Sequence, residues 1–286
     1  MDCTTASSPC SASYPQDTNV TLTETPAAGS TFAGWSGGGC SGTATTCTVT
    51  MTAAESVTAT FYPALSVTLA GNGSGTVSSS PAGINCGGAG NSACTAGFPG
   101  GSQVTLSATT AAGSVFDGFS GADCPAGFST TCTVTMNGAQ SVTATFLASQ
   151  SVSGSVPGSI TVTSGQVLYL NGAHVGGAVV VQAGGSLFAT GASIAGALIA
   201  TGANGISLSS TTVGGAVKIT SSTGPVQLVG SRVSGSATIS GNGPSTVIAG
   251  NHFGGSLGGT GNSGLTDSGQ PNTVVGSRSG QFTGSF

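Results

Sequence analysis

One short phrase recurs five times in the second half of the chain, at an almost constant interval. Each copy joins an apolar residue to a run of small residues, and the intervals between copies are 19, 19, 20 and 20 residues. A period in this range, written in short β-type runs and small residues, is typical of a solenoid whose coils stack on one another. The copies begin at Val175, Ile194, Val213, Val233 and Phe253.

Alignment of the five copies predicts which side chains face the interior of the solenoid. Four columns are apolar in nearly every coil, and Gly and Ser occupy the corners between them. We therefore predict an all-β chain in which residues 149–286 form a single-stranded parallel β-helix. A run at 159–162 begins the stack, and a C-terminal cap starts at about residue 260, where the period breaks. The columns are Val175, Ile194, Val213, Val233 and Phe253; Val179, Leu198, Val217, Ala237 and Leu257; Leu170, Ala189, Leu208, Leu228 and Ile248; and Leu168, Leu187, Ile206, Val226 and Thr246.

The chain carries very few charges. Of 286 residues only 3% are charged, with three Lys or Arg and seven Asp or Glu, whereas roughly 25% is usual in soluble proteins. Three cations are too few for a salt-dependent grip on nucleic acid or for a basic membrane-binding patch. No apolar run approaches the ~20 residues of a transmembrane helix. We expect no nucleic-acid partner, no transmembrane segment and no cofactor.

The cysteines all lie in the first half of the chain and form four close pairs. Zinc sites of the common kind use pairs separated by two to four residues, whereas these pairs enclose six or seven. Four local disulfides are therefore favoured over zinc sites, and each contributes about 2.5 kcal/mol by the loop-entropy estimate. The predicted pairs are Cys3 with Cys10, Cys40 with Cys47, Cys86 with Cys94, and Cys124 with Cys132.

The disulfides bear on where the protein resides. Disulfides persist outside the cytosol, so we expect an extracellular or cell-surface location. The chain opens with Met1, Asp2 and Cys3 and has neither the basic start nor the apolar stretch of a signal peptide. We therefore expect that Met1 is not the natural start and that the sequence is truncated.

The cysteine-containing half is an internal repeat. Residues 20–61 reappear as residues 104–146, displaced by 84 to 85 positions. Alternating apolar and polar residues predict half-buried strands in both copies. Trp35 and Phe119 occupy equivalent positions and are interpreted as core anchors, with a sugar-stacking platform as the alternative.

The two copies differ at their beginning. Two strand-like runs, 66–69 and 75–78, precede Cys86 in the second copy and have no counterpart in the first. We assign residues 1–62 to a truncated repeat and 63–148 to a complete one. The truncated repeat is expected to have an unpaired strand edge.

These copies resemble the divergent internalin B-repeat family of bacterial surface proteins. The resemblance is carried by residues 20–36, the Cys40–Cys47 loop and residues 56–61, with the second copy over 66–146. It implies a small β-grasp-like or related β-rich module, usually in tandem on secreted proteins, and no catalytic residue.

The solenoid block also resembles a known group. Residues 170–177, 250–257 and 271–274 are similar to coils of secreted bacterial β-helix proteins, distantly like the bactofilins. Such relatives tend to carry cysteines near the terminal cap. Gly258, Gly259 and Phe282 stand there in this chain, so a cap disulfide is not available and the end is free to fray.

Residues that could support catalysis or metal binding are few and scattered. His174 and His252 lie four coils apart, about 19 Å by stacking distance, so they cannot share a metal; with Arg232 in the same column they are interpreted as solvated. Residues 34–38 fit a nucleophile-elbow pattern but lack the following helix and a nearby His. Asp117 and Asp123 are interpreted as structural or solvated. We expect no enzymatic activity, and no catalytic, cofactor-binding or metal-ligating residue is assigned.

The remaining candidate is an apolar contact surface on the first two coils. Tyr169 and Phe188 face outward on one side, and Val180 and Ile199 on another. Exposed apolar strips often mark interaction surfaces, and we predict that this one docks the preceding module or another subunit. The counterparts in later coils are polar: Ser207, Gln227, Lys218 and Thr238.

Together these features predict a non-enzymatic extracellular or cell-surface structural or adhesion protein. Its repeats would act as a stalk and its β-helix as a display or assembly surface. The expected partner is a protein or glycan at the cell surface, or a second copy of the chain. Two alternatives stay open: a carbohydrate-binding or polysaccharide-processing β-helix protein, and a self-polymerising bactofilin-like scaffold.

Overall fold

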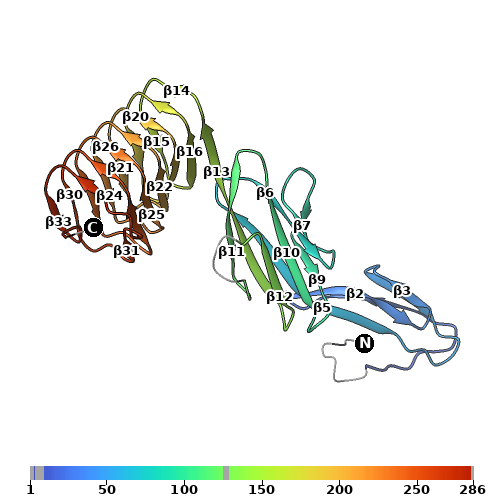
Figure 1. Cartoon of the computed structure of the whole chain (residues 1–286). Coiled ribbons are helices and arrows are strands. Elements are labelled where there is room, and N and C mark those ends of the chain that lie inside the picture. Colours follow the sequence, from blue (N-terminus) through green and yellow to red (C-terminus); the bar gives the residue numbers. More distant parts are fainter. Residues whose placement is uncertain (1–2, 4–9, 125–128, 285–286) are drawn as a thin grey trace. The chain divides into compact units, whose positions relative to one another are not determined.

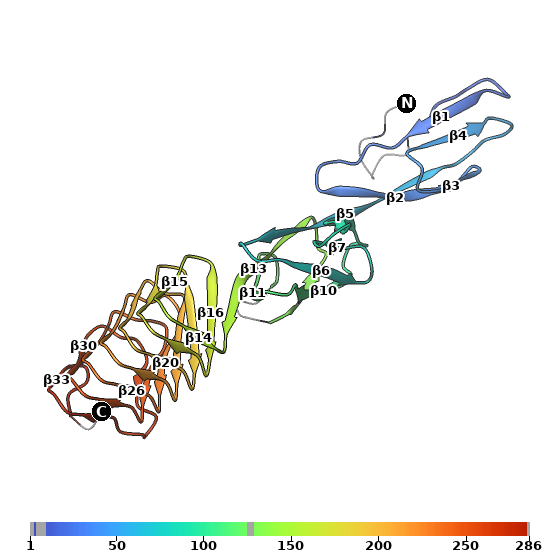
Figure 2. The same cartoon turned by 90° about the horizontal axis from the view of Figure 1, so that it is seen from above.

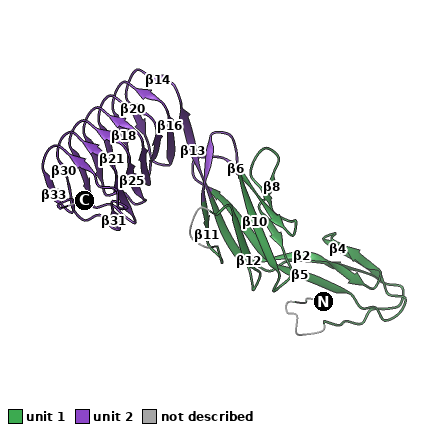
Figure 3. Cartoon of the chain, viewed as in Figure 1, with its two compact units in different colours: residues 1–69, 76–109, 118–144 green, residues 70–75, 110–117, 145–286 purple. Residues whose placement is uncertain are grey.

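The fold was analysed in a computed structural model, which describes residue 3 and residues 10–124 and 129–284. Met1, on which the expected truncation was argued, lies outside the described residues. The described part contains strands and no α-helix, which confirms the all-β prediction. It falls into two compact units, residues 1–69, 76–109 and 118–144, and residues 70–75, 110–117 and 145–286 (Figure 3).

The first repeat is built on short antiparallel ladders. β1 pairs with β4 from Asn19↔Thr50 to Thr23↔Thr46, and β2 pairs with both β3 and β5. A small core of Trp35, Cys40 and Val49 lies among them. The strands are β1 (Asn19–Thr23), β2 (Ser30–Gly37), β3 (Cys40–Gly42), β4 (Thr46–Thr50) and β5 (Thr58–Ala70).

The second repeat contains the same ladder and additional strands. β10 pairs with β12 as β1 pairs with β4, and a five-stranded sheet forms in the order β12-β10-β6-β7-β8. The family resemblance implied a β-grasp-like or related β-rich module. The described residues contain strands and no helix, so the broader of these two expectations, a β-rich module, is confirmed. The strands are β6 (Gly75–Ser80), β7 (Asn85–Cys86), β8 (Ser92–Ala93), β9 (Thr95–Gly97), β10 (Gln103–Thr110), β11 (Ser114–Ser120), β12 (Thr131–Thr135) and β13 (Gln140–Val152).

The second half of the chain is a parallel solenoid in which three ladders of strands run along a stack of seven coils (Figures 1 and 2). The end of β13 starts the first ladder, which continues through β16 (Gln166–Asn171), β19 (Ser186–Thr190), β22 (Gly205–Ser209), β25 (Val226–Val229), β28 (Thr246–Ala249) and β31 (Leu265–Thr266). The second comprises β14 (Ser155–Val156), β17 (His174–Val175), β20 (Ser193–Ile194), β23 (Thr212–Val213), β26 (Arg232–Val233), β29 (His252–Phe253) and β32 (Thr273–Val274). The third comprises β15 (Ile160–Val162), β18 (Val179–Val181), β21 (Leu198–Thr201), β24 (Val217–Thr220), β27 (Ala237–Ser240), β30 (Leu257–Gly259) and β33 (Arg278–Gly280).

The strand register confirms the predicted core columns. Leu168, Leu187, Ile206, Val226 and Thr246 are successive partners along the first ladder, and all are buried. Apolar columns from all three ladders meet in one continuous core cluster. Burial of these stacked side chains is the main source of stability, since each coil can bury its apolar face only against its neighbours.

The structure corrects the predicted ends of the solenoid. The repeated phrase occurs five times, whereas the structure has seven coils. In the additional coils, β14 and β15 precede the first copy of the phrase, and β31, β32 and β33 follow the last. The period does not break after Asn262: Phe253 pairs with Val274 in the next coil, 21 residues later. The ladder therefore continues to Gly280, and the cap begins near Gln281 instead of at about residue 260.

A column of glycines explains the recurring phrase. The third residue of every copy is Gly, and from the second coil onward each N–H in this column donates to the Gly carbonyl one coil earlier at 2.9–3.1 Å. A Cβ on Gly215 would lie 2.8 Å from the backbone nitrogen of Ala197. Backbone packs against backbone at this corner, so a side chain has no room. The column consists of Gly158, Gly177, Gly196, Gly215, Gly235, Gly255 and Gly276.

Phe282 closes the C-terminal end of the solenoid. Its side chain is fully buried and belongs to the solenoid core. The neighbouring Gln281 accepts hydrogen bonds at Oε1 from the backbone N–H and Nδ2 of Asn262, and its Nε2 donates to the Asn262 carbonyl. The absence of a cap cysteine therefore does not leave the end open, because an aromatic side chain fills it.

Buried asparagines form two ladders along the later coils, which the sequence did not lead us to expect. Asn251 donates from Nδ2 to the Leu228 carbonyl at 2.7 Å and to Oδ1 of Asn272 at 2.9 Å, and its Oδ1 accepts from the Ser231 N–H at 2.8 Å. Asn242 and Asn262 make a similar ladder at another corner. These amides satisfy backbone groups at corners where the chain leaves the strand ladders.

Thr246 is the one polar residue in the column that runs from Leu168 to Leu265, and its buried hydroxyl has no hydrogen-bond partner among the described residues. Replacing Thr246 with Val keeps the side-chain shape and removes the unsatisfied hydroxyl. We expect the free energy of unfolding to rise by about 1 kcal/mol, measured by urea denaturation. Thr212→Val, at an exposed position of the second ladder, serves as the control and should change stability by less than about 0.5 kcal/mol. A Thr246→Val protein no more stable than wild type would contradict this expectation.

Candidate functional site

The two aromatic residues of the predicted contact surface lie side by side on the first ladder. Tyr169 in β16 and Phe188 in β19 are register partners. Each points outward, because its neighbours in the strand, such as Leu168 and Leu170, point into the core. The rings are stacked, with centroids 5.3 Å apart and planes inclined by 19°. Phe188 is 39% exposed and Tyr169 is half-buried.

The two aliphatic residues form a second strip on another face. Val180 in β18 and Ile199 in β21 are register partners on the third ladder, and Ile199 is 41% exposed. The structure thus brings together the members of each predicted pair and keeps the pairs on separate ladders. We call Tyr169 with Phe188 the aromatic strip, and Val180 with Ile199 the aliphatic strip.

Polar residues bound both strips along the solenoid. Ser151 and Ser207 are the register partners on either side of the aromatic strip, and Thr161 and Lys218 flank the aliphatic strip. Each strip therefore covers two coils and ends at hydroxyl or charged side chains. Sequence analysis did not identify Val275 as an exposed apolar residue, because its segment was assigned to the cap. In the structure Val275 lies on the seventh coil and is 69% exposed.

The titratable groups of the solenoid do not assemble into a site. His174 and His252 lie in one outward column of the second ladder, with Ser193, Thr212 and Arg232 between them. Four coils of about 4.8 Å separate the two imidazoles, as the period predicted. Among the residues that the structure describes, no group of three or more His, Cys, Asp or Glu side chains could hold a metal ion.

The two aspartates considered from the sequence occupy different environments. Burial raises the pKa of the Asp117 carboxyl above its ordinary value, because partial removal from water disfavours the charged form. Asp123 accepts a hydrogen bond at Oδ2 from the Thr135 N–H at 3.2 Å, which is a structural role. The two carboxyls belong to different units of the chain.

Comparison with known protein families finds one family model that matches the first half of the chain twice. Residues 4–64 and residues 65–150 each match the family model described as the divergent InlB B-repeat domain. The two matches together span more than half of the 286 residues. The chain belongs to the divergent InlB B-repeat family. No curated protein and no solved structure matches it significantly. The bactofilin-like assignment of the solenoid rests on sequence resemblance alone.

The disulfides close short loops within the first half of the chain. All eight cysteines are paired as predicted, with Cα atoms 4.6 to 5.9 Å apart. Cys47 and Cys132 occupy the same place in the two repeats, opposite Leu22 of β1 and Leu106 of β10. The Cys40–Cys47 bond joins β3 to β4, and the other bonds close loops of small modules whose cores are too thin to supply much stability alone.

The nucleophile-elbow pattern of the first InlB B-repeat is part of an ordinary strand. Ser36 lies within β2 and pairs with Ser41 and Thr58 on either side. Its neighbour Trp35 is 8% exposed and donates from Nε1 to the Ala44 carbonyl at 2.8 Å. Trp35 is thus a core anchor that ties down a loop, and Ser36 lacks the strand–turn–helix setting of a nucleophile.

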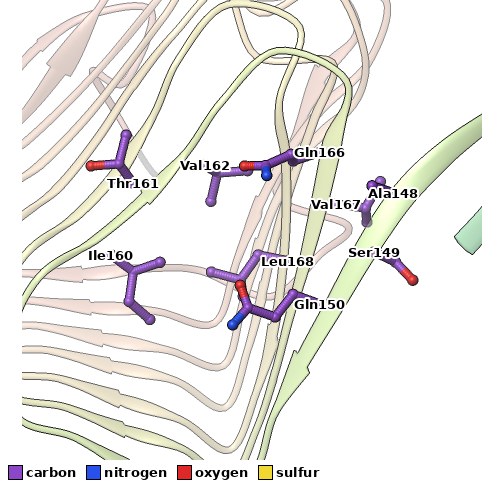
Figure 4. Close-up of a pocket in the computed structure, with 9 residues that line it drawn as sticks. All are labelled: Ala148, Ser149, Gln150, Ile160, Thr161, Val162, Gln166, Val167 and Leu168. Atoms are coloured by element: carbon purple, nitrogen blue, oxygen red, sulfur yellow. The ribbon is translucent and has the colours of Figure 1, made fainter. Parts of the chain in front are cut away.

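One small cavity lies at the beginning of the solenoid. It has a volume of about 70 Å³ and is lined by residues of β13, β15 and β16, with Ile160, Val162 and Leu168 as its apolar part (Figure 4). Ligand pockets usually measure about 300–1,000 Å³, so this space is too small for a sugar or cofactor. In the described residues no helix is long and apolar enough to cross a membrane.

Proposed function

We propose that this chain is a non-enzymatic structural or adhesion protein of the bacterial cell surface or extracellular space. In this proposal the InlB B-repeats form a stalk and the solenoid presents a contact surface. The family match and the four disulfides support the compartment. The scarcity of titratable groups on the solenoid supports a role in contact instead of chemistry.

The aromatic strip is the observation that carries the proposal. Two stacked rings face solvent on a ladder whose neighbouring outward positions are Ser151 and Ser207. Each ring covers one face of the other, so the strip offers ring edges and a compact apolar area to a partner. Such an area suits a protein surface, including a second copy of the chain.

Carbohydrate binding is the second candidate, because hydroxyl and amide side chains surround the aromatic strip. Ser151, Ser207 and Gln227 follow one another along the same outward column, interrupted only by the two rings. Sugars stack on free ring faces, however, and the mutual stacking of Tyr169 and Phe188 leaves each ring only one. Polymerisation in the bactofilin manner is less favoured, since Phe282 and Gln281 close the last coil.

The contact role can be tested with beads that carry the full chain through an N-terminal tag. We expect such beads to clump, and the Tyr169→Ser, Phe188→Ser double variant to clump at least about tenfold more weakly, the equivalent of ~1.4 kcal/mol of contact energy. Light scattering measures the rate.

The matched control is Ser207→Ala with Gln227→Ala, which alters the same column beyond the strip and should clump like wild type. Equal clumping by the aromatic double variant would contradict the contact role. Binding of the wild-type chain on a glycan array, lost in that variant, would favour the carbohydrate candidate instead.

A further inference from the structure

The first coil of the solenoid is incompletely covered on its N-terminal side. Three of its inward residues are half-buried, whereas their register partners in the second coil are at most 2% exposed. Each coil buries its apolar residues against the coils on either side, and the first coil lacks such a neighbour on one side. The half-buried residues are Val152, Val156 and Ile160, and their covered partners are Leu170, Val175 and Val179.

Two loops of the second InlB B-repeat cover one part of this side. The loops contain Asn72 and Gly113 and belong to the same compact unit as the solenoid. The Ala148 N–H donates to Oδ1 of Asn72 at 2.9 Å, and the Ser149 N–H donates to the carbonyl of the second loop at 2.8 Å. The backbone of β13 is therefore paired where this strand enters the first ladder.

The outer edge of β15, on the third ladder, is not paired in this way. The Ile160 N–H donates to the Ala178 carbonyl at 2.9 Å, toward β18. The Val162 carbonyl accepts from the Gln182 N–H on the same side, also at 2.9 Å. Alternate residues of a strand in a parallel sheet bond to opposite sides, so the N–H and carbonyl of Thr161 point away from β18. In the part of the chain that the structure describes, no strand pairs with this outer side.

The unpaired edge is confined to Thr161. The next residue that faces the same side is Thr163, and Gln166 occupies both of its backbone groups. The Thr163 N–H donates to Oε1 of Gln166 at 3.0 Å, and the Thr163 carbonyl accepts from the Gln166 N–H at 3.1 Å. An edge this short can take one partner strand without inviting the extended pairing that leads to aggregation.

The small cavity at the beginning of the solenoid lies beside this edge. Figure 4 shows the side chains of Leu168 and Gln150 pointing toward Ile160 across the cavity. Gln150 is the register partner of Leu168 in the first coil, so the cavity borders the position that an apolar residue of a preceding coil would fill. Its volume of about 70 Å³, too small for an ordinary ligand, suits one aliphatic side chain.

We propose that the edge of β15 binds an extended, uncharged segment of a partner protein. The segment adds to β15 as a parallel strand, through hydrogen bonds to the N–H and carbonyl of Thr161. One of its aliphatic side chains enters the cavity between Ile160 and Leu168. This site is separate from the aromatic strip and does not depend on it.

The surroundings of the edge select this occupant over others. A helix pairs its own backbone groups and would leave those of Thr161 unpaired, whereas a strand continues the interface that already joins β15 to β18. Residues 145–173 contain no charged side chain, so a charged segment would lose hydration without gaining an ion pair. A second solenoid cannot stack on this end, because the loops that contain Asn72 and Gly113 occupy its first-ladder side.

The test uses the full chain and a synthetic peptide with the sequence of residues 157–164, labelled with fluorescein at its N-terminus. This peptide has the strand pattern of β15 and no charged side chain. We expect a saturable rise in fluorescence anisotropy and slower hydrogen exchange of the Thr161 amide of the chain in the complex. A peptide carrying Ile160→Ser should bind about tenfold or more weakly, because it brings no aliphatic side chain to the cavity.

Two variants of the chain separate strand addition from other modes of binding. Thr161→Pro removes the N–H that the partner strand needs, and Pro is tolerated on an edge strand where its nitrogen faces outward. We expect this variant to lose peptide binding while the Gln182 amide, which bonds to Val162, stays protected as the sign of an intact ladder. The matched control is Thr161→Ala, which keeps the N–H and should bind like wild type. If the Gln182 amide loses protection, the Ile160→Ser peptide decides.

Three results would overturn the proposal: no saturable binding, equal binding of the Ile160→Ser peptide, or a Thr161 amide that gains no protection in the complex. A Thr161 amide that is already protected in the free chain would also overturn it, since the chain itself would then cover the edge. Protection that rises with protein concentration in the absence of peptide would assign the edge to a second copy instead.

Discussion

Replacing Phe282 with Ala is expected to lower the free energy of unfolding of the last solenoid coils by about 3–5 kcal/mol, the usual cost of emptying a buried aromatic site. Phe282 is fully buried and ends the core cluster. Removing its ring opens the base of the stack to water and weakens the adjacent bonds between Gln281 and Asn262. In a stack where each coil contacts only its neighbours, the loss starts at that end.

Hydrogen exchange measures this effect coil by coil. The amide of Val275, which donates to the Phe253 carbonyl at 2.9 Å in wild type, should exchange far faster in Phe282→Ala, while amides of the middle coils change little. The control is Val275→Ala, which shortens a side chain that is 69% exposed and should alter stability by no more than about 0.5 kcal/mol. If Phe282→Ala kept wild-type protection in the seventh coil, Phe282 would not be its closure.

Replacing Gly215 with Val is expected to destabilise the solenoid by about 3 kcal/mol, the upper part of the range for overpacked sites. A Cβ at this position lies 2.8 Å from the Ala197 nitrogen and from the Gly196 carbonyl carbon. Both are backbone atoms and cannot rotate away. The coil must shift, and the hydrogen bond from the Gly215 N–H to the Gly196 carbonyl, 3.0 Å long, is strained or lost.

The glycine column supplies its own control. Gly158 occupies the same corner in the first coil, but a Cβ there meets no atom within 4 Å. Gly158→Val should therefore unfold at nearly the wild-type urea concentration, whereas Gly215→Val should unfold at a clearly lower one. Equal losses in the two variants would show that the cost arises from the general conformational preference of glycine and not from close packing of coils.

The sequence predicted the solenoid well where a pattern repeats. The period alone placed Tyr169 beside Phe188 and Val180 beside Ile199, because a residue's neighbour in a stacked coil lies one period away. It placed a strand of the first coil at 159–162, where β15 lies, but it missed the last coil, since residues 274–276 retain the apolar residue and the glycine of the phrase but otherwise depart from it. The backbone hydrogen bonds between coils require only a main chain that can pair and an apolar side chain that packs in the core. A coil can therefore form even where the rest of the repeated phrase is absent.

Features that depend on packing could not be predicted in this way. Asn251 and Asn272 look like ordinary turn residues in the sequence, and only the stacked coils reveal that their side chains bond to each other. The stacking of the Tyr169 and Phe188 rings is likewise set by three-dimensional structure. The need for glycine at position 75, where any Cβ would overlap the ring of Phe146, likewise emerged only from the structure.

The glycine column also affects how a protein of this kind can change in length during evolution. Because each coil presents the same backbone donor and acceptor to the coils on either side, a whole coil can be duplicated or lost at this corner with the joint still matching. A change of one coil, 19 to 21 residues, then alters the reach of the solenoid by about 4.8 Å. A change that does not amount to whole coils would bring side chains into the glycine corner, so length in this fold varies in discrete steps.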